Sequence, residues 1–224
     1  YKHMHQHLVP VTTSNKSFWC TLNDTLTIGT AMQTESSVRT TLALIYITLE
    51  DENGLTVTVA KAVVPGLTLD NHRIFRENLP TQLTKIGKNI TITECPDING
   101  HYRCLLQEIK MPMMMSNRSV VQVYYLIENC DAHGSMIFIS SSRSTDDIVA
   151  AQSAKIKKNV IANNIINYMK LTPTETGCNV ETVTCFDIAG SIPDALKRKG
   201  ADKMKAGPMR MIHLIKTGEA PRGE

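Results

Sequence analysis

The sequence predicts an α+β fold in which one long antiparallel sheet is closed by a C-terminal helix. Three observations support this prediction: a strong hairpin signal, a series of strand-like runs joined by turn residues, and a final segment with helical spacing of apolar residues. The chain has 224 residues, of which 42% are hydrophobic, so it can build one large domain or two small ones. A sheet of this length wraps a helix instead of a second sheet, which leaves internal space where the two do not interdigitate.

The first part of the chain predicts a leader and a helix. Residues 1–14 mix His, Thr, Val and Pro without a period, so we expect a loose leader. A helix is predicted over Ser17–Met32, where Trp19, Leu22 and Leu26 recur at helical spacing. We assign residues 15–217 to one domain and residues 218–224 to a tail.

The next segment predicts a hairpin followed by a short helix. Thr41–Glu50 and Leu55–Val64 are rich in β-branched residues, and the Asn-Gly pair between them suits a hairpin turn. Thr68 can cap a helix that runs to Leu79, where Pro80 interrupts it. The apolar side of this helix is predicted to contain Ile74, Phe75 and Leu79.

The middle of the chain predicts an antiparallel meander. Its joins contain turn residues, among them Pro96–Gly100 and Asp131–Gly134, so successive strands should pair with each other. A further pair of strands surrounds the turn Pro173–Gly177. The six predicted strands are Asn89–Cys95, Tyr102–Lys110, Ser119–Glu128, Ser135–Ser142, Asn159–Leu171 and Cys178–Ile188.

The chain ends in a predicted amphipathic and basic helix. Ser191 can cap it, Pro193 suits its first turn, and Gly207-Pro208 can bend it, because Pro lacks the helical N–H. Residues 192–216 contain seven Lys or Arg and two Asp, a local charge of 7 − 2 = +5. The apolar stripe is Ile192, Leu196, Gly200, Met204, Gly207, Met211 and Ile215.

Several functional classes find no support in the sequence. No apolar run approaches the roughly 20 residues of a membrane-spanning helix, no secretory signal is evident, and the cytoplasm is the default location. The patterns of zinc proteases, serine hydrolases and phosphate-binding loops are missing, so we expect no enzyme. A metal at His3, His5 and His7 would require the leader to be held in place, so we expect no metal there.

Three stretches of the sequence resemble one known family. They are Tyr102–Pro112 followed by Ser116–Val121, the pair Val160–Lys170 and Val180–Asp187, and the helix entry Phe186–Leu196. Their order and spacing are similar to those of the START family, the steroidogenic-acute-regulatory-protein-related lipid-transfer domains. The resemblance implies a helix-grip fold, in which a curved antiparallel sheet wraps around a long C-terminal helix, with an internal apolar cavity for one lipid. It also implies a monomer without a cofactor.

The strand pattern and the resemblance together predict the lipid-binding residues. Alternation places Val120, Gln122, Tyr124 and Leu126 on one face, and Ile161, Asn163, Ile165 and Asn167 on one face of another strand; by analogy both sets face inward. The resemblance places Glu94 and Asn117 where ceramide-type members contact the headgroup. Tyr124 replaces the buried Arg of cholesterol-type members, and Ser119 replaces a usual Asp. The predicted lipid-binding set is Glu94, Asn117, Gln122, Tyr124, Leu126, Asn163, Ile165, Thr182, Leu196, Met204 and Met211.

These features predict binding and non-vesicular transfer of one lipid, of the phospholipid, ceramide or sterol class, behind a gate formed by the C-terminal helix. Lys197, Lys203 and Lys205 are predicted to contact anionic membrane surfaces transiently, as a peripheral protein does. No nucleic-acid partner is expected, because the basic segment has apolar periodicity. One alternative is a lipid-sensing or scaffolding module without transfer. Another is an enzyme of the same superfamily that acts on a hydrophobic substrate.

Overall fold

The computed structural model places most of the predicted domain. It describes residues 44–50, 55–87, 89–96, 103–112, 115–142, 156, 158–190, 192 and 207–220. The predicted helix over Ser17–Met32 lies outside these ranges, as do the Asn-Gly turn of the first hairpin and residues 193–206 of the predicted final helix.

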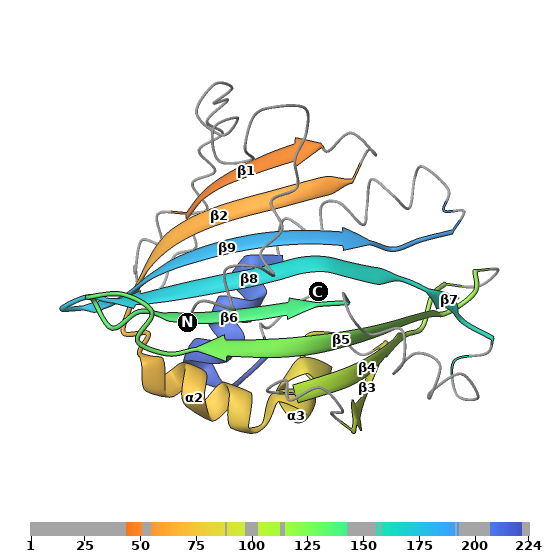
Figure 1. Ribbon diagram of the computed structural model, residues 1–224, viewed down its shortest axis with the longest axis horizontal. Helices are drawn as coiled ribbons and strands as arrows, with labels where there is room; N and C mark the ends of the chain where they lie inside the picture. Colours follow the sequence, from red (N-terminus) through yellow and green to blue (C-terminus); the bar gives the residue numbers. More distant parts are fainter. Residues whose placement is uncertain are drawn as a thin grey trace, which may run out of the picture.

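One curved sheet forms the body of the described chain (Figure 1). Its strands are β1 (Leu44–Glu50), β2 (Thr56–Pro65), β3 (Ile90–Cys95), β4 (Arg103–Ile109), β5 (Arg118–Ile127), β6 (Met136–Ser141), β7 (Val160–Ile161), β8 (Asn163–Pro173) and β9 (Gly177–Asp187). The order is β1-β2-β9-β8-β6-β5-β4-β3, and each of these neighbours is antiparallel. Strand β7 pairs with β5 in parallel. The predicted hairpin and meander are therefore confirmed.

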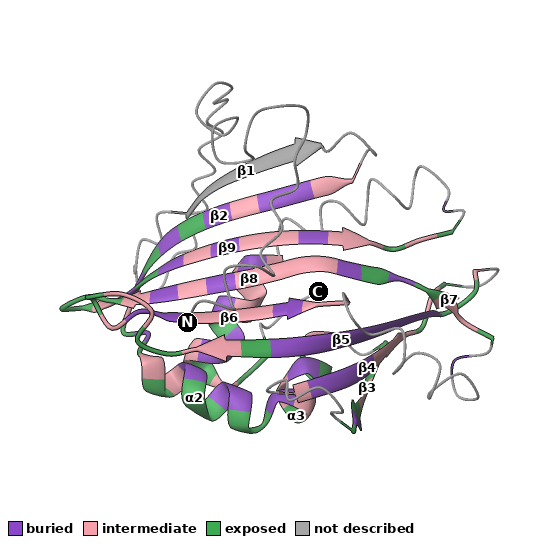
Figure 2. Ribbon diagram, viewed as in Figure 1, coloured by how far each residue is buried: buried purple, intermediate pink, exposed green. Residues whose placement is uncertain are grey.

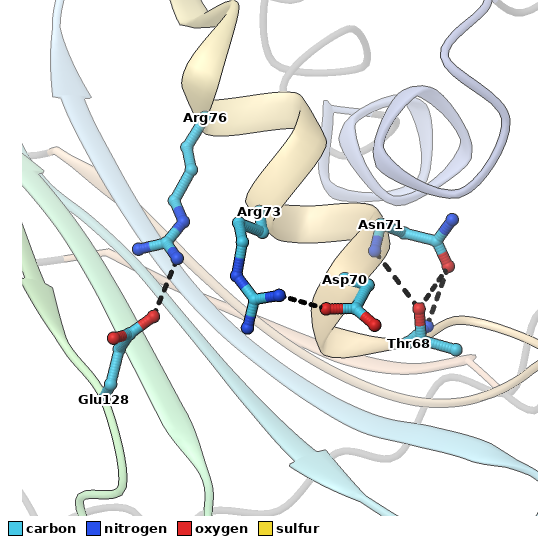
Figure 3. Close-up of polar contacts among 6 residues, drawn as sticks. All are labelled: Thr68, Asp70, Asn71, Arg73, Arg76 and Glu128. Carbon is cyan, nitrogen blue, oxygen red and sulfur yellow. Dashed lines mark hydrogen bonds and ion pairs between the residues drawn. The ribbon is translucent and has the colours of Figure 1, made fainter.

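Two short helices link β2 to β3. Helix α2 (Leu69–Glu77) begins as predicted at Thr68, whose Oγ1 accepts a hydrogen bond from the Asn71 backbone N at 3.1 Å. The Asn71 side chain accepts in return from the Thr68 backbone N at 2.9 Å, so two of the unpaired N–H groups at the helix start are satisfied (Figure 3). Helix α3 (Leu79–Thr84) carries Pro80 in its first turn. Pro80 thus ends one helix and starts the next, because its fixed φ suits a helix N-terminus.

The predicted apolar side of α2 is partly wrong. Ile74 is 59% exposed, whereas His72 is fully buried and Arg76 nearly so. Positions 72, 75 and 76 follow the spacing of one helical face, and His72 on this face packs against Phe138 of the sheet. Burial on α2 therefore follows helical geometry more closely than side-chain polarity.

The C-terminal helix (residues 207–217) covers one face of the sheet, which we call the inner face. In Figure 1 this blue helix passes behind β9, β8 and β6. Its buried residues Ile212, Leu214 and Ile215 pack into the main core, together with Phe75 of α2 and Leu79 of α3. The sheet contributes Ala62, Val64, Leu105, Tyr124, Met136, Met169, Leu171, Cys178 and Val180 to this core.

A smaller cluster lies on the opposite, outer face. Cys95, Cys104, Leu106, Val121 and Val123 alternate along β3, β4 and β5 with the inner residues, and Ile156 packs against them. Both faces of this edge of the sheet are therefore buried, which accounts for the nearly continuous burial of β5 in Figure 2.

Candidate ligand-binding face

Strand register arranges the inner face in rows that cross the sheet. Residues directly opposite each other on antiparallel strands project from the same face. One such row runs over five neighbouring strands, β2, β9, β8, β6 and β5, and all its members are uncharged hydroxyl or amide side chains. This polar row consists of Thr58, Thr184, Asn167, Ser140 and Tyr124.

The polar row separates two parts of the inner face. On one side lie rows of mostly apolar residues that extend into the core beneath the C-terminal helix. They are Ala60, Thr182, Met169, Phe138 and Leu126, followed by Ala62, Val180, Leu171 and Met136. On the other side lie the amides of Asn164 and Gln122. The inner face is thus amphipathic, with its apolar part at the C-terminal helix.

A chain of buried hydrogen bonds, which we call the inner network, joins the polar row to these amides. Asn164 Nδ2 donates to Gln122 Oε1 at 2.7 Å and to Ser140 Oγ at 2.9 Å. Gln122 Nε2 donates to Gln107 Oε1 at 3.1 Å, and Ser140 shares a side-chain hydrogen bond with Tyr124. Burial strongly raises the pKa of the Tyr124 hydroxyl, so this group stays protonated. The network fixes its side chains without using any ionised group.

Two hydroxyls on the same face have no such partner. Thr58 Oγ1 and Thr182 Oγ1 are buried, and neither makes a hydrogen bond within the described chain. A buried polar atom without a partner costs roughly 1–3 kcal/mol. Two such atoms on neighbouring strands, at the border of the apolar part, are suited to receive a hydrogen-bonding group of a ligand.

A further polar side chain, His72 of α2, is buried in this core. Its ring meets the edge of Phe138 at 5.0 Å between centroids and lies 5.8 Å from Phe75, and neither ring nitrogen has a hydrogen-bond partner in the described chain. Burial, and then the nearby Arg76 cation, lower the pKa of His72 to about 3. The imidazole is therefore neutral near pH 7. Arg76 itself forms an ion pair with Glu128 at 2.7 Å (Figure 3).

Arg118 anchors the exit of β9 toward the final segment. Its buried guanidinium donates to the carbonyl oxygens of Ile188 and Ala189 at 3.1 Å each, and to that of Ser116. Ala189 and Gly190 both have positive φ, 53° and 71°, so this turn is tightly specified. All the acceptors are backbone oxygens, which gives Arg118 a positioning role in the fold.

Part of the predicted lipid-binding set is brought together on the inner face. Gln122 and Tyr124 belong to the inner network, Leu126 and Thr182 lie in the adjacent apolar row, and Met211 packs against the core from the C-terminal helix. These residues come from three separate elements, β5, β9 and the C-terminal helix.

The predicted inward position of Asn163 is wrong. Asn163 is exposed and pairs with Asp187 on the outer face, whereas its neighbour Asn164 is only 4% exposed and joins the inner network. A β-bulge between Asn164 and Ile166 causes this change, with Ile165 as the extra, half-buried residue. One inserted residue reverses the alternation of the strand beyond it.

Two other predicted residues do not reach the inner network. The Glu94 side chain is 56% exposed and forms an ion pair with Arg103 at 3.1 Å. Asn117 is exposed between β4 and β5, where its Oδ1 accepts from the Met111 backbone N at 3.1 Å. Leu196, Met204, Lys197, Lys203 and Lys205 lie outside the described residues.

The structure adds residues that the sequence prediction missed. Gln107, Ser140 and Asn164 complete the inner network, and Thr58 contributes an unpartnered hydroxyl. Ser140 could have been found from the sequence, because antiparallel pairing of the predicted strands Ser119–Glu128 and Ser135–Ser142 can place it opposite Tyr124. The position of Asn164 depends on the bulge, which has no clear signal in the sequence. In the described residues, no group of three His, Cys, Asp or Glu is arranged to hold a metal.

Comparison with solved structures identifies this architecture in known proteins. The human StarD13 (DLC2) lipid transfer and protein localization domain matches with a TM-score of 0.56 and 13% identity, over 86% of this chain and 90% of that one. Human StAR-related lipid transfer protein 5 matches with a TM-score of 0.59 and 11% identity, over 89% and 91%. The chain has the helix-grip fold of the START domains.

The START fold of this chain is accompanied by strong divergence in sequence. A bacterial STAR-related lipid transfer protein, from Xanthomonas axonopodis, shares 13% identity and a TM-score of 0.58, over 85% of this chain and 97% of that one. No family model and no curated protein sequence matches the chain. The likeness to START domains is therefore one of fold. No helix within the described ranges is both long and apolar enough to cross a bilayer.

Proposed function

We propose that this protein binds one lipid on its inner face and transfers it between membranes. The observation that carries the proposal is the amphipathic inner face, with apolar rows on one side and unpartnered buried hydroxyls at their border. The START fold supports the same conclusion, since the matched structures are named as lipid-transfer proteins. A lipid has the same division into an apolar and a polar part.

In this proposal the acyl chains lie along the apolar rows, in the internal cavity predicted from the sequence. Met169 and Phe138 of the sheet, and Met209 and Met211 of the C-terminal helix, contribute flexible or aromatic surface there. Methionine is unbranched and adapts its shape, so it accommodates chains of different lengths. The polar part of the lipid contacts the polar row and the inner network.

The C-terminal helix serves as the gate in this proposal. Pro208 lies in the first turn of its described part, and Lys85 Nζ donates to the Gly218 carbonyl at 2.7 Å just after its end. One end of the helix is thus tied to the segment after α3 by a hydrogen bond, while the other end begins at Gly207-Pro208, where Gly is flexible and Pro has no backbone N–H. Movement about Pro208 would uncover the inner face.

The proposal includes how the protein contacts a membrane and where it acts. Lys197, Lys203 and Lys205 precede Pro208 in the sequence and would meet an anionic membrane during opening, each contributing about 1 kcal/mol. We propose a cytoplasmic, peripheral and monomeric carrier that works without catalysis, cofactor or nucleic acid. A sensor or scaffold that binds lipid without transfer is the second candidate, because the deep contact of Ile212, Leu214 and Ile215 with the core also suits a closed helix.

A vesicle assay tests the proposal. Donor vesicles carry a fluorescent lipid, acceptor vesicles carry none, and the protein is added at increasing concentration. A transfer rate that rises with protein concentration is the expected result. Mass spectrometry of lipids extracted from the re-isolated protein separates the candidates: retention without transfer favours the sensor, and no retained lipid contradicts lipid binding altogether.

A further inference from the structure

The polar row carries no charge from β2 to β5, and the residue opposite Tyr124 on the next strand, β4, is Arg103. From β2 to β5 its members are three hydroxyls of Thr and Ser, one Asn amide and one Tyr hydroxyl, and the inner network adds only the amides of Asn164, Gln122 and Gln107. Side chains of this kind both donate and accept hydrogen bonds. They therefore match a group that also donates and accepts.

The cations nearest to this row are already engaged. Arg103 of β4 lies opposite Tyr124 of β5 and forms an ion pair with Glu94 at 3.1 Å. Arg76 of α2 forms an ion pair with Glu128 at 2.7 Å. Arg118 is held by three backbone carbonyls. His72 is neutral near pH 7 because of its burial. Among the described residues, each of these cations near the inner face is therefore already bound to another group and is not available to pair with a buried anion.

From this arrangement we infer that the lipid carries an uncharged headgroup with hydroxyl or amide groups, as ceramide, diacylglycerol and sterols do, and not a phosphate or carboxylate. The inference rests on the proposed function. A buried phosphate without a counter-charge loses its hydration and gains no ion pair, which disfavours it strongly. A hydroxyl or amide instead completes the hydrogen bonding of Thr58 and Thr182, whose hydroxyls have no partner in the part of the chain that the structure describes.

The test compares lipids in competition. The full chain is incubated with vesicles that contain equal amounts of ceramide, diacylglycerol, cholesterol, phosphatidylcholine and phosphatidylserine, and the lipids retained after re-isolation are quantified by mass spectrometry. We expect at least about tenfold enrichment of one or more uncharged lipids over both phospholipids. The separate amounts of retained ceramide, diacylglycerol and cholesterol show which uncharged headgroup the protein prefers. Equal or preferred retention of a phospholipid would overturn the inference and leave the proposed function standing, whereas retention of no lipid would overturn the proposed function.

Two neighbouring residues provide a matched pair of variants. Asn164→Leu removes the central amide of the inner network, whereas Asn163→Leu makes the same change on the outer face. We expect Asn164→Leu to lower retention of the uncharged lipid about tenfold, which corresponds to the loss of one hydrogen bond, and Asn163→Leu to leave it unchanged. Equal effects of the two variants would contradict the assigned site.

Thr182→Val tests the inference even if the network variant folds poorly. This substitution keeps the shape of the side chain and removes a hydroxyl that has no hydrogen-bond partner among the described residues. The melting temperature of the ligand-free protein should therefore rise, while retention of the uncharged lipid falls severalfold. A variant that retains uncharged lipid as well as the original protein would overturn the role of Thr182 in binding the headgroup.

Discussion

Acidification should destabilise this protein through His72. The ring is fully buried between α2 and β6, both nitrogens lack a partner in the described chain, and Phe138 meets it edge to face. Burial and the Arg76 cation together lower its pKa from 6.5 to about 3. Folding therefore requires the neutral imidazole, and the perturbation that tests this is a change in pH.

The sign and size of the effect follow from proton binding. The pKa is lowered in the folded state, so between about pH 3 and pH 6.5 the unfolded chain binds a proton at this residue that the folded chain does not. The free energy of unfolding consequently falls as the pH is lowered through this window. From about pH 7.5 to about pH 5 the contribution of His72 falls by about 2 kcal/mol, since each unit below 6.5 corresponds to about 1.4 kcal/mol.

Urea unfolding at these two pH values measures the effect, and two variants isolate it. His72→Phe keeps an aromatic ring and removes the titrating group, so it should lose about 2 kcal/mol less stability on acidification than the original protein. His133→Gln, at the exposed turn between β5 and β6, should behave like the original protein. If His72→Phe loses as much stability as the original protein, the assignment of a buried neutral His72 is refuted.

Two further predictions concern the backbone. A Cβ at Gly177 would lie 2.2 Å from the Val64 carbonyl oxygen and 2.8 Å from the Gly66 N, so Gly177→Ala should lower the free energy of unfolding by about 3 kcal/mol. The control is Gly207→Ala, whose added Cβ meets no atom of the described residues within 4 Å and should change the free energy of unfolding little. A Gly177→Ala protein as stable as the control would contradict this close approach. Thr68→Ala removes the N-cap of α2 and should lower the midpoint of urea unfolding by an amount equivalent to about 1 kcal/mol, whereas Thr68→Ser should restore most of it. An unchanged midpoint in Thr68→Ala would contradict the capping role.

Local signals in the sequence were sufficient for most of the sheet. The run Ser119–Glu128 predicted a strand because of its β-branched residues, and β5 occupies Arg118–Ile127. Thr68 predicted the start of α2 because Thr is a favoured N-cap residue, and in the structure its hydroxyl accepts from the backbone N of Asn71. Each of these features depends on residues only a few positions apart, which is why sequence patterns report them.

The errors arise where distant segments decide the outcome. Alternation predicted Asn163 on the inner face, but the bulge next to Asn164 depends on how β8 pairs with β9. His72 was missed because a polar residue on a short helix is usually exposed, whereas the packing of α2 against Phe138 buries it and leaves Ile74 in solvent. Glu94 faces the right side of β3 but lies near its end, where Arg103 and solvent satisfy it.

The most direct test of lipid binding on the inner face is photo-crosslinking with residue-level mapping. A lipid with a diazirine in its acyl chain is bound to the full chain, activated by light, and the labelled residues are identified by mass spectrometry. Strand alternation separates Met169 on the inner face from Tyr168 and Lys170 on the outer face. The account predicts label on Met169 and on Met209 or Met211 of the C-terminal helix. Label confined to Tyr168, Lys170 or other outer-face residues would contradict it.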